Sequence, residues 1–256
     1  MKSFKHSGTF GDLIYSLPVV KFLEGGKFYL HLNQIDYLTQ LNYGSQPDPY
    51  HRGRMTEQDY LSLRDLMLAQ DYVESFDILD PNTAEITHNL DRFRVPFRSH
   101  PGNYVDIYSG LFPSIPLDHY SELRNQPWLT VPNPRVIDGR TVVINRTGRW
   151  PSNVARQSYD LIREQGAEKD SVFIGHESEY LAFKQEMGWD IPFHRTANLL
   201  EMAEVIAAAD QFIGNQSVAL SLAIGLGVEF ACELRTDLPI ERNECFFPNH
   251  PNGDYF

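Results

Sequence analysis

Residues 1–32 read MKSFKHSGTFGDLIYSLPVVKFLEGGKFYLHL, and this stretch decides the fold. A short apolar start precedes a polar turn, S-G-T-F-G-D, at residues 7–12. Apolar residues then recur near helical spacing from Leu13 to Leu23, with Pro18 expected to bend the helix. Gly25-Gly26 ends the helix, and KFYLHL at 27–32 is typical of a strand. The order strand, turn, helix, strand predicts an α/β protein.

The rest of the first half is less regular. Residues 56–70 predict an amphipathic helix with Thr56 as its N-cap. Residues 75–79 favour a strand, and residues 103–112 favour a short helix. Because tyrosine, proline, asparagine and histidine are dense here, we interpret this region as the loop-rich half of an α/β domain.

Strands and helices alternate clearly in the second half. Pro127, Pro132 and Pro134 mark residues 125–140 as an interdomain linker. Strands are expected at 141–148 (with its turn), 170–175 and 210–214, and helices at 152–166, 177–188, 198–209 and 215–227. Such alternation predicts a parallel, doubly wound sheet. We therefore expect two Rossmann-like domains, 1–130 and 138–256, facing a cleft.

Charge and cysteine content restrict the possible partners. The 256 residues carry a formal net charge of -12, which repels nucleic acid and anionic membranes unless a local basic patch overcomes it. No apolar run is long enough to span a bilayer, and the N-terminus does not resemble a secretory signal. Cys232 and Cys245 are the two cysteines, so free thiols in a reducing, cytoplasmic compartment are expected.

Four polar turns each follow a predicted strand and precede a predicted helix. In an open α/β sheet such turns line the binding crevice, and helix N-termini suit phosphate. A phosphorylated ligand is therefore the expected occupant. The candidate residues are Ser7, Gly8, Thr9, Gly11 and Asp12; Asn145, Arg146, Thr147 and Arg149; Gly175, His176 and Glu177; and Asn215, Gln216 and Ser217.

Several familiar motifs are missing from the sequence. It has no G-x-x-x-x-G-K-[ST] loop, no G-x-G-x-x-G and no G-x-S-x-G, which counts against P-loop ATPases, nicotinamide dehydrogenases and common serine hydrolases. Its nine histidines show no metal-ligand spacing, so no metal site is expected. Residues 88–100, HNLDRFRVPFRSH, mix aromatic and basic residues; a solvated loop is favoured over a nucleic-acid contact.

The order of these blocks resembles GT-B glycosyltransferases, most closely the lipopolysaccharide heptosyltransferase family, glycosyltransferase family 9. The matching stretches are SGTFGDLIYSLPVV (7–20), VVINRTGRWP (142–151), VFIGHESE (172–179), NLLEMAEVIAAAD (198–210) and FIGNQSVALSLAIGLGV (212–228). The resemblance covers residues 1–32 and about 140–232. It implies a compact GT-B fold.

The resemblance also implies roles for particular residues. Asp12 matches the family's general base, which deprotonates the acceptor hydroxyl of an inverting transfer. Thr147, Arg149, Gln216 and Ser217 match positions that contact the diphosphate of a nucleotide sugar. Glu177 or Glu179 matches an acceptor of ribose hydroxyls. The implied donor is a nucleotide-diphosphate sugar, with no cofactor or metal; the acceptor and the oligomeric state stay open.

In the last block the chain departs from the family, where Gln216, Val218 and Ser221 replace Asp, Gly and His. Ser221 is still counted among the candidate nucleotide-sugar-binding residues. These changes leave a non-catalytic binder of a nucleotide or nucleotide sugar as one alternative. A glycosyltransferase acting on a hydroxylated DNA base, contacted through Arg92, Arg94 and Arg98, is another. For Asp12 itself, the alternative is a charge that complements the helix dipole.

Overall fold

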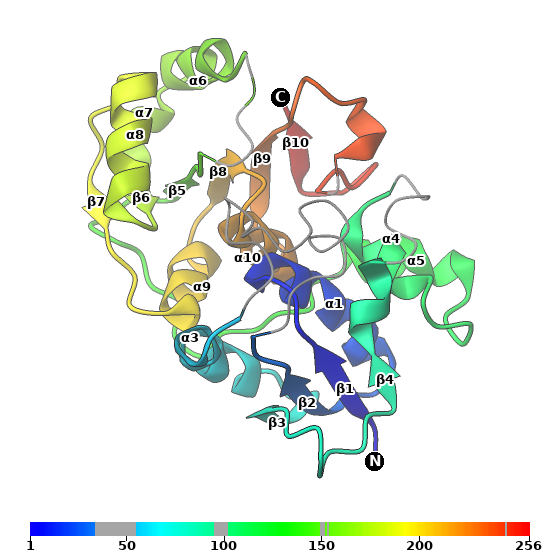
Figure 1. Ribbon diagram of the computed structural model, residues 1–256. Helices are drawn as coiled ribbons and strands as arrows, with labels where there is room; N and C mark the ends of the chain where they lie inside the picture. Colours follow the sequence, from blue (N-terminus) through cyan, green and yellow to red (C-terminus); the bar gives the residue numbers. More distant parts are fainter. Residues whose placement is uncertain (34–54, 95–101, 149–151, 153, 244) are drawn as a thin grey trace, which may run out of the picture. The chain divides into compact units, whose positions relative to one another are not determined.

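The computed structural model describes residues 1–33, 55–94, 102–148, 152, 154–243 and 245–256 (Figure 1). The chain divides into two compact units, Met1–Arg124 and Asn125–Phe256. Each contains a parallel sheet with helices, as the alternating sequence pattern predicts. Within the described ranges, no helix has the length and apolar character that a membrane crossing requires.

The first unit has a four-stranded parallel sheet in the order β3-β2-β1-β4. Its strands are β1 (Ser3–His6), β2 (Gly26–Leu30), β3 (Val73–Ile78) and β4 (His88–Asn89). Its helices are α1 (Phe10–Phe22), α3 (Glu57–Leu68), η1 (Leu90–Arg94), α4 (Tyr104–Ser109), η3 (Leu117–His119) and α5 (Tyr120–Asn125). All elements predicted here are present; β4 was not predicted, because two residues carry no periodic pattern.

Helix α1 joins β1 to β2 and is buried over most of its length. Leu13, Leu17 and Val20 are fully buried, in line with the apolar spacing. Pro18 lies inside the helix, where it removes one backbone donor. The turn into β2 needs glycine: Gly25 has φ +68°, and a Cβ there would lie 2.0 Å from the Tyr72 carbonyl oxygen.

The second unit has a six-stranded parallel sheet in the order β10-β9-β8-β5-β6-β7. Its strands are β5 (Val142–Asn145), β6 (Ser171–Ile174), β7 (Phe193–His194), β8 (Gln211–Asn215), β9 (Glu229–Glu233) and β10 (Gly253–Tyr255). Its helices are α6 (Ala155–Glu164), α7 (Ala167–Asp170), α8 (Glu177–Met187), α9 (Leu199–Ala207), α10 (Val218–Leu226) and η4 (Ile240–Arg242).

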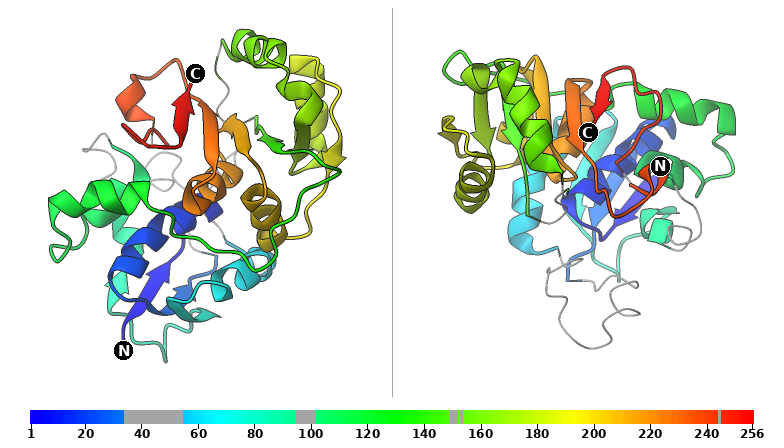
Figure 2. Two further views of the ribbon diagram at one scale, coloured as in Figure 1. Left: turned by 180° about the vertical axis from the view of Figure 1, so that it is seen from behind. Right: turned by 90° about the horizontal axis from the view of Figure 1, so that it is seen from above.

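The winding direction of this sheet reverses between β5 and β8. The chain runs outward through β5, β6 and β7, returns to β8 beside β5, and then runs the other way through β9 and β10. Right-handed crossovers in opposite directions place α6 and α8 on one face and α10 on the other, which can be followed in Figure 2. A hydrophobic cluster that includes Ile144, Phe173, Tyr159 and Phe183 fills the first of these faces.

Three strands of the second unit were not predicted. β7 and β10 are short edge strands, and β9 follows Gly227 so closely that its residues read as the end of a helix. The expected helix at 152–166 begins at Ala155 instead, with Val154 as its N-cap. Ser152 lies before the helix, where its hydroxyl accepts a hydrogen bond from the Val154 amide (3.2 Å).

The proline-rich segment 125–140 packs within the second unit. Trp128 and Leu129 are buried, and their amides both donate to the Gly225 carbonyl, at 2.9 and 2.8 Å. Arg135 pairs with Glu201 at the start of α9. The segment therefore packs as part of the second unit. Its proline-rich composition alone did not distinguish this packing from an interdomain linker.

Candidate functional site

The reversal between β5 and β8 creates a topological switch point in the second sheet. Asn145 and Gly214 are paired at the carboxyl ends of these two strands. Beyond this pair the backbone after β5 and the backbone after β8 turn to opposite faces of the sheet. In sheets of this kind such a reversal opens a crevice. Two of the predicted turns, the one that begins with Asn145-Arg146-Thr147 and the one at 214–217, start here.

Asn215 fixes the two turns to each other. Its side-chain oxygen accepts the Thr147 amide (2.9 Å), and its side-chain nitrogen donates to the Thr147 carbonyl (2.7 Å). Asn215 is fully buried, whereas Thr147 is half-buried. The amide group of Asn215 thus holds the Thr147 backbone, and the ligand contact expected for Asn215 stays a prediction.

Asn145 has a similar structural role on the other side. It is buried, and its side-chain nitrogen donates to the Ile174 carbonyl (2.9 Å) at the end of β6. Gly175 has φ +123°, and a Cβ at this position would lie 2.6 Å from that nitrogen. Glycine is therefore required here so that the turn after β6 can lie close to β5.

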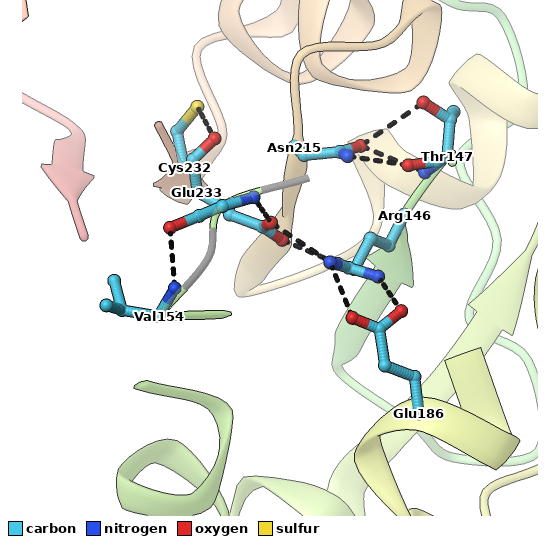
Figure 3. A network of polar contacts seen from close by, with 8 residues as sticks. Arg146, Thr147, Val154, Glu186, Asn215, Cys232 and Glu233 are labelled. Carbon is cyan, nitrogen blue, oxygen red and sulfur yellow. Dashed lines mark hydrogen bonds and ion pairs between the residues drawn. The ribbon is translucent and has the colours of Figure 1, made fainter. Parts of the chain in front are cut away.

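Arg146 lies between two carboxylates (Figure 3). Its guanidinium binds Glu233 through Nε (2.6 Å) and Nη2 (3.1 Å), and Glu186 through Nη1 (2.6 Å) and Nη2 (3.2 Å). Burial alone would lower the pKa of Arg146, but hydrogen bonds to both glutamates and the charge of Glu233 raise it above its ordinary value. A phosphate contact by Arg146 stays a prediction, and in this structure its guanidinium binds these two carboxylates.

Helix α10 begins at this switch point with its positive end uncompensated. Ser217 is its N-cap and accepts the Leu220 amide (3.3 Å), and no acidic residue lies in the first turn. Ser221 is fully buried and donates to the Val218 carbonyl (2.7 Å) of its own helix. A ligand contact by Ser221 stays a prediction. Gln216 is half-buried beside Ser217.

The turn after β6 carries the remaining predicted residues of the second unit. His176 is the N-cap of α8, and its amide donates to Glu179 (3.2 Å). Glu179 is half-buried and serves as a capping residue, while His176 and Glu177 are exposed. Of these residues, Glu177 fits best the expected contact with a ligand hydroxyl.

In the first unit, Asp91 organises the turn after β1. Its Oδ1 accepts both the amide and the hydroxyl of Ser7, each at 2.8 Å, and its Oδ2 pairs with Lys5 at 3.2 Å. Buried His6 accepts the Gly8 amide through Nδ1 (2.8 Å). Asp91 follows β4, the neighbour of β1, at the point where winding of this sheet reverses.

Asp12 lies in the first turn of α1, at the carboxyl end of β1. Its Oδ2 accepts the Thr9 amide (3.1 Å), so it caps the helix as the alternative interpretation of the sequence expected. Gly11 precedes it, and among the described residues no atom lies within 4 Å of the position of an added Cβ. Because packing does not require glycine there, Gly11 leaves space beside Asp12.

Some predicted residues lie outside the described ranges. Arg149 and Arg98 are among them, and only the backbone of Arg94 is described. Arg92 is exposed in η1. In the part of the chain that is described, no group of three or more histidine, cysteine or acidic side chains is arranged to hold a metal ion.

Sequence reasoning missed Asp91, Glu186 and Glu233. Asp91 and Glu233 each lie at or just beyond the carboxyl end of a strand that was not predicted, β4 and β9. A polar residue in that position is the signal that would have identified them, once the strand itself was recognised. Glu186 lies near the end of α8, and nothing in its local pattern distinguishes it from a surface residue.

Comparison with known proteins shows similarity in structure only. No protein-family model and no curated protein sequence matches the chain. A family 9 glycosyltransferase from Veillonella parvula matches over 99% of this chain and 86% of its own, with TM-score 0.61 and 10% identity. The iron-containing dodecameric glycosyltransferase TibC of enterotoxigenic E. coli matches over 96% and 60%, with TM-score 0.55 and 15% identity.

A third structure, the E. coli heptosyltransferase WaaC with ADP, matches over 100% of this chain and 92% of its own, with TM-score 0.50 and 12% identity. These matches show that the chain has the α/β fold of GT-B glycosyltransferases and resembles the heptosyltransferases of family 9. The expected fold class is confirmed.

Proposed function

We propose that the chain is an inverting glycosyltransferase that moves a sugar from a nucleotide-diphosphate sugar to an acceptor hydroxyl. The second unit holds the nucleotide diphosphate, and Asp12 in the first unit is the general base. The observation that carries this proposal is the switch point between β5 and β8, where Thr147 and the uncompensated N-terminus of α10 meet. The family 9 fold supports it.

The leaving diphosphate gains negative charge as the bond to the sugar breaks. The first-turn amides of α10 and the Thr147 hydroxyl are donors suited to that charge. Arg146 already forms ion pairs with Glu233 and Glu186, and it thereby holds the start of the loop that contains Thr147. The phosphate is bound by the neutral donors. No bound metal is needed in this scheme, and activity should persist in the presence of a chelator.

The acceptor hydroxyl attacks the anomeric carbon from the face opposite the diphosphate, which inverts the configuration. Its proton passes to the Asp12 carboxylate. The same carboxylate accepts the Thr9 amide, which orients it at the start of α1. Gly11 leaves room for a sugar beside it.

A binding protein without turnover is the second candidate. It is favoured by Ser221, which stands where the family carries histidine and which is buried against its own helix. The free thiols of Cys232 and Cys245, 3.8 Å apart, fit a reducing cytoplasmic location for either candidate.

Incubation with a panel of nucleotide sugars, with release of nucleoside diphosphate as the readout, tests the proposal. The wild type should release diphosphate from one of them in the presence of an acceptor extract, also with EDTA present. Asp12→Ala should retain nucleotide binding and lose transfer. Binding without release would favour the second candidate, and full transfer by Asp12→Ala would rule out Asp12 as the base.

A further inference from the structure

Glu233 is a buried carboxylate at the end of β9, with a side chain that is 0% exposed. Among the described residues it accepts two hydrogen bonds from Arg146 (2.6 and 3.1 Å), drawn in Figure 3, and one from the Ser152 amide (2.6 Å). A buried carboxylate with this set of donors is rigidly held, since each lone pair that loses its partner would cost desolvation energy.

These bonds hold two described residues that follow β5. Arg146 directly follows β5, and Ser152 lies three residues before the start of α6. Asn215 holds Thr147, the residue next to Arg146, from the β8 side. Glu233 therefore connects β9 to Arg146, beside Thr147, and to Ser152, although Glu233 itself lies two strands away from β5 in the sheet.

Glu186, the other partner of Arg146, differs from Glu233 in its surroundings. Its side chain is 50% exposed, and water can replace its ion pair. Glu233 lies in surroundings that exclude solvent. Tyr159, which is nearby, is fully buried, and the Tyr159 hydroxyl has no hydrogen-bond partner among the described residues. Burial, followed by the charge of Glu233, raises the pKa of Tyr159 well above its ordinary value.

We propose that Glu233 is a positioning residue for nucleotide-diphosphate binding, acting through Arg146 to hold the neighbouring Thr147 in its binding geometry. This inference rests on the proposed function. Glu233 does not touch the ligand; without it, Arg146 loses its buried partner and keeps the half-exposed Glu186, and the Ser152 amide loses its acceptor.

Two variants separate this role from a general loss of folding. Glu233→Gln removes the charge and replaces one acceptor oxygen with a donor that faces Arg146. Glu233→Asp keeps the charge that Arg146 needs, but its shorter side chain cannot reach both Arg146 and Ser152. Glu168→Gln is the matched control, because Glu168 makes the same two-bond pair with Arg163 (2.6 and 3.2 Å) on α6, and it contacts neither Arg146 nor Ser152.

Each full-length variant is titrated calorimetrically with ADP, UDP, GDP and CDP, and amide hydrogen exchange is measured for Thr147 and Ser152. Both Glu233 variants should weaken binding of the preferred nucleotide by about tenfold or more. Both should also accelerate exchange at Ser152, while Glu233→Asp keeps the melting temperature near that of the wild type. Glu168→Gln should change neither affinity nor exchange.

Unchanged exchange and unchanged affinity in a folded Glu233→Asp variant would overturn the inference. Faster amide exchange with unchanged nucleotide affinity would also overturn the inference, since the backbone at Thr147 and Ser152 would then be more mobile without any effect on ligand binding. If the wild type binds none of the four nucleotides, the proposed function fails and this inference fails with it. If the wild type binds a nucleotide and the Glu233 variants bind it equally well, the positioning role of Glu233 is refuted while the proposed function stands.

Discussion

Replacing Asn215 by leucine removes the connection between the two turns at the switch point while keeping nearly the same side-chain volume. The two hydrogen bonds to the Thr147 backbone, at 2.9 and 2.7 Å, are lost, together with the longer one from the Thr147 hydroxyl (3.5 Å). We expect the second unit to become less stable and the nucleotide to bind more weakly, because the Thr147 backbone then loses its bonds to the β8 side of the switch point.

The magnitude follows from the surroundings of Thr147. A hydrogen bond in a protein contributes about 0.5–1.5 kcal/mol net, so two contribute about 1–3 kcal/mol. The full cost of an unsatisfied buried group does not apply, since Thr147 is half-buried and water can reach it. With a urea dependence of about 1.5 kcal/mol per M, the unfolding midpoint should fall by about 0.7–2 M.

Tryptophan fluorescence reports this transition selectively, because all three tryptophans (Trp128, Trp150 and Trp189) lie in the second unit. Asn252→Leu is the control: it removes one hydrogen bond, to the Gly227 carbonyl (2.7 Å), at the amino end of the sheet. The control should lower the midpoint slightly and leave nucleotide affinity unchanged. A midpoint shift below about 0.3 M for Asn215→Leu, with unchanged slope, would refute the reasoning.

Three further predictions concern other parts of the fold. Gly175→Ala should destabilise the second unit by about 1–3 kcal/mol in the same urea experiment, since φ is +123° and the added Cβ meets Asn145; an unchanged midpoint would contradict this. Burial and then the charge of Lys5 lower the pKa of His31 below 6.5, against the opposing effect of Asp91. The first unit should therefore lose stability as the pH falls below about 6.5. In thermal melts followed by circular dichroism, His31→Gln should flatten this dependence of stability on pH. Cys232 and Cys245 are fully buried, so a thiol reagent should modify both only after unfolding in urea; rapid reaction of the native chain would contradict their burial.

Much of the fold was predictable because strong periodic patterns carry it. The buried residues of α1 and the alternation from β5 to α10 follow directly from apolar spacing. The elements missed are two- and three-residue edge strands, such as β7 and β10, and the strand β9 that follows closely after α10. Their pairing depends on neighbours distant in sequence, which a local pattern does not contain.

The candidate site was predictable in its location but less so in the role of each residue. Strand-to-helix turns identified the switch points, and Thr147 and Ser217 lie in two of these turns; their contact with a ligand stays a prediction. The sequence did not show that Arg146 faces Glu233 and Glu186, because those partners are 87 and 40 residues away, respectively. Asn145 and Asn215 likewise bind backbone groups of neighbouring turns, a use that becomes visible only in three dimensions.

The central claim is that a nucleoside diphosphate binds at the switch point of the second unit. Amide NMR of the isotope-labelled chain, titrated with the nucleoside diphosphate that binds best, tests it most directly. We expect the largest shift changes at Thr147, Gly148 and residues 216–220, with Arg163 and Glu168 unaffected. No change at saturating nucleotide, or changes confined to other parts of the chain, would contradict the account.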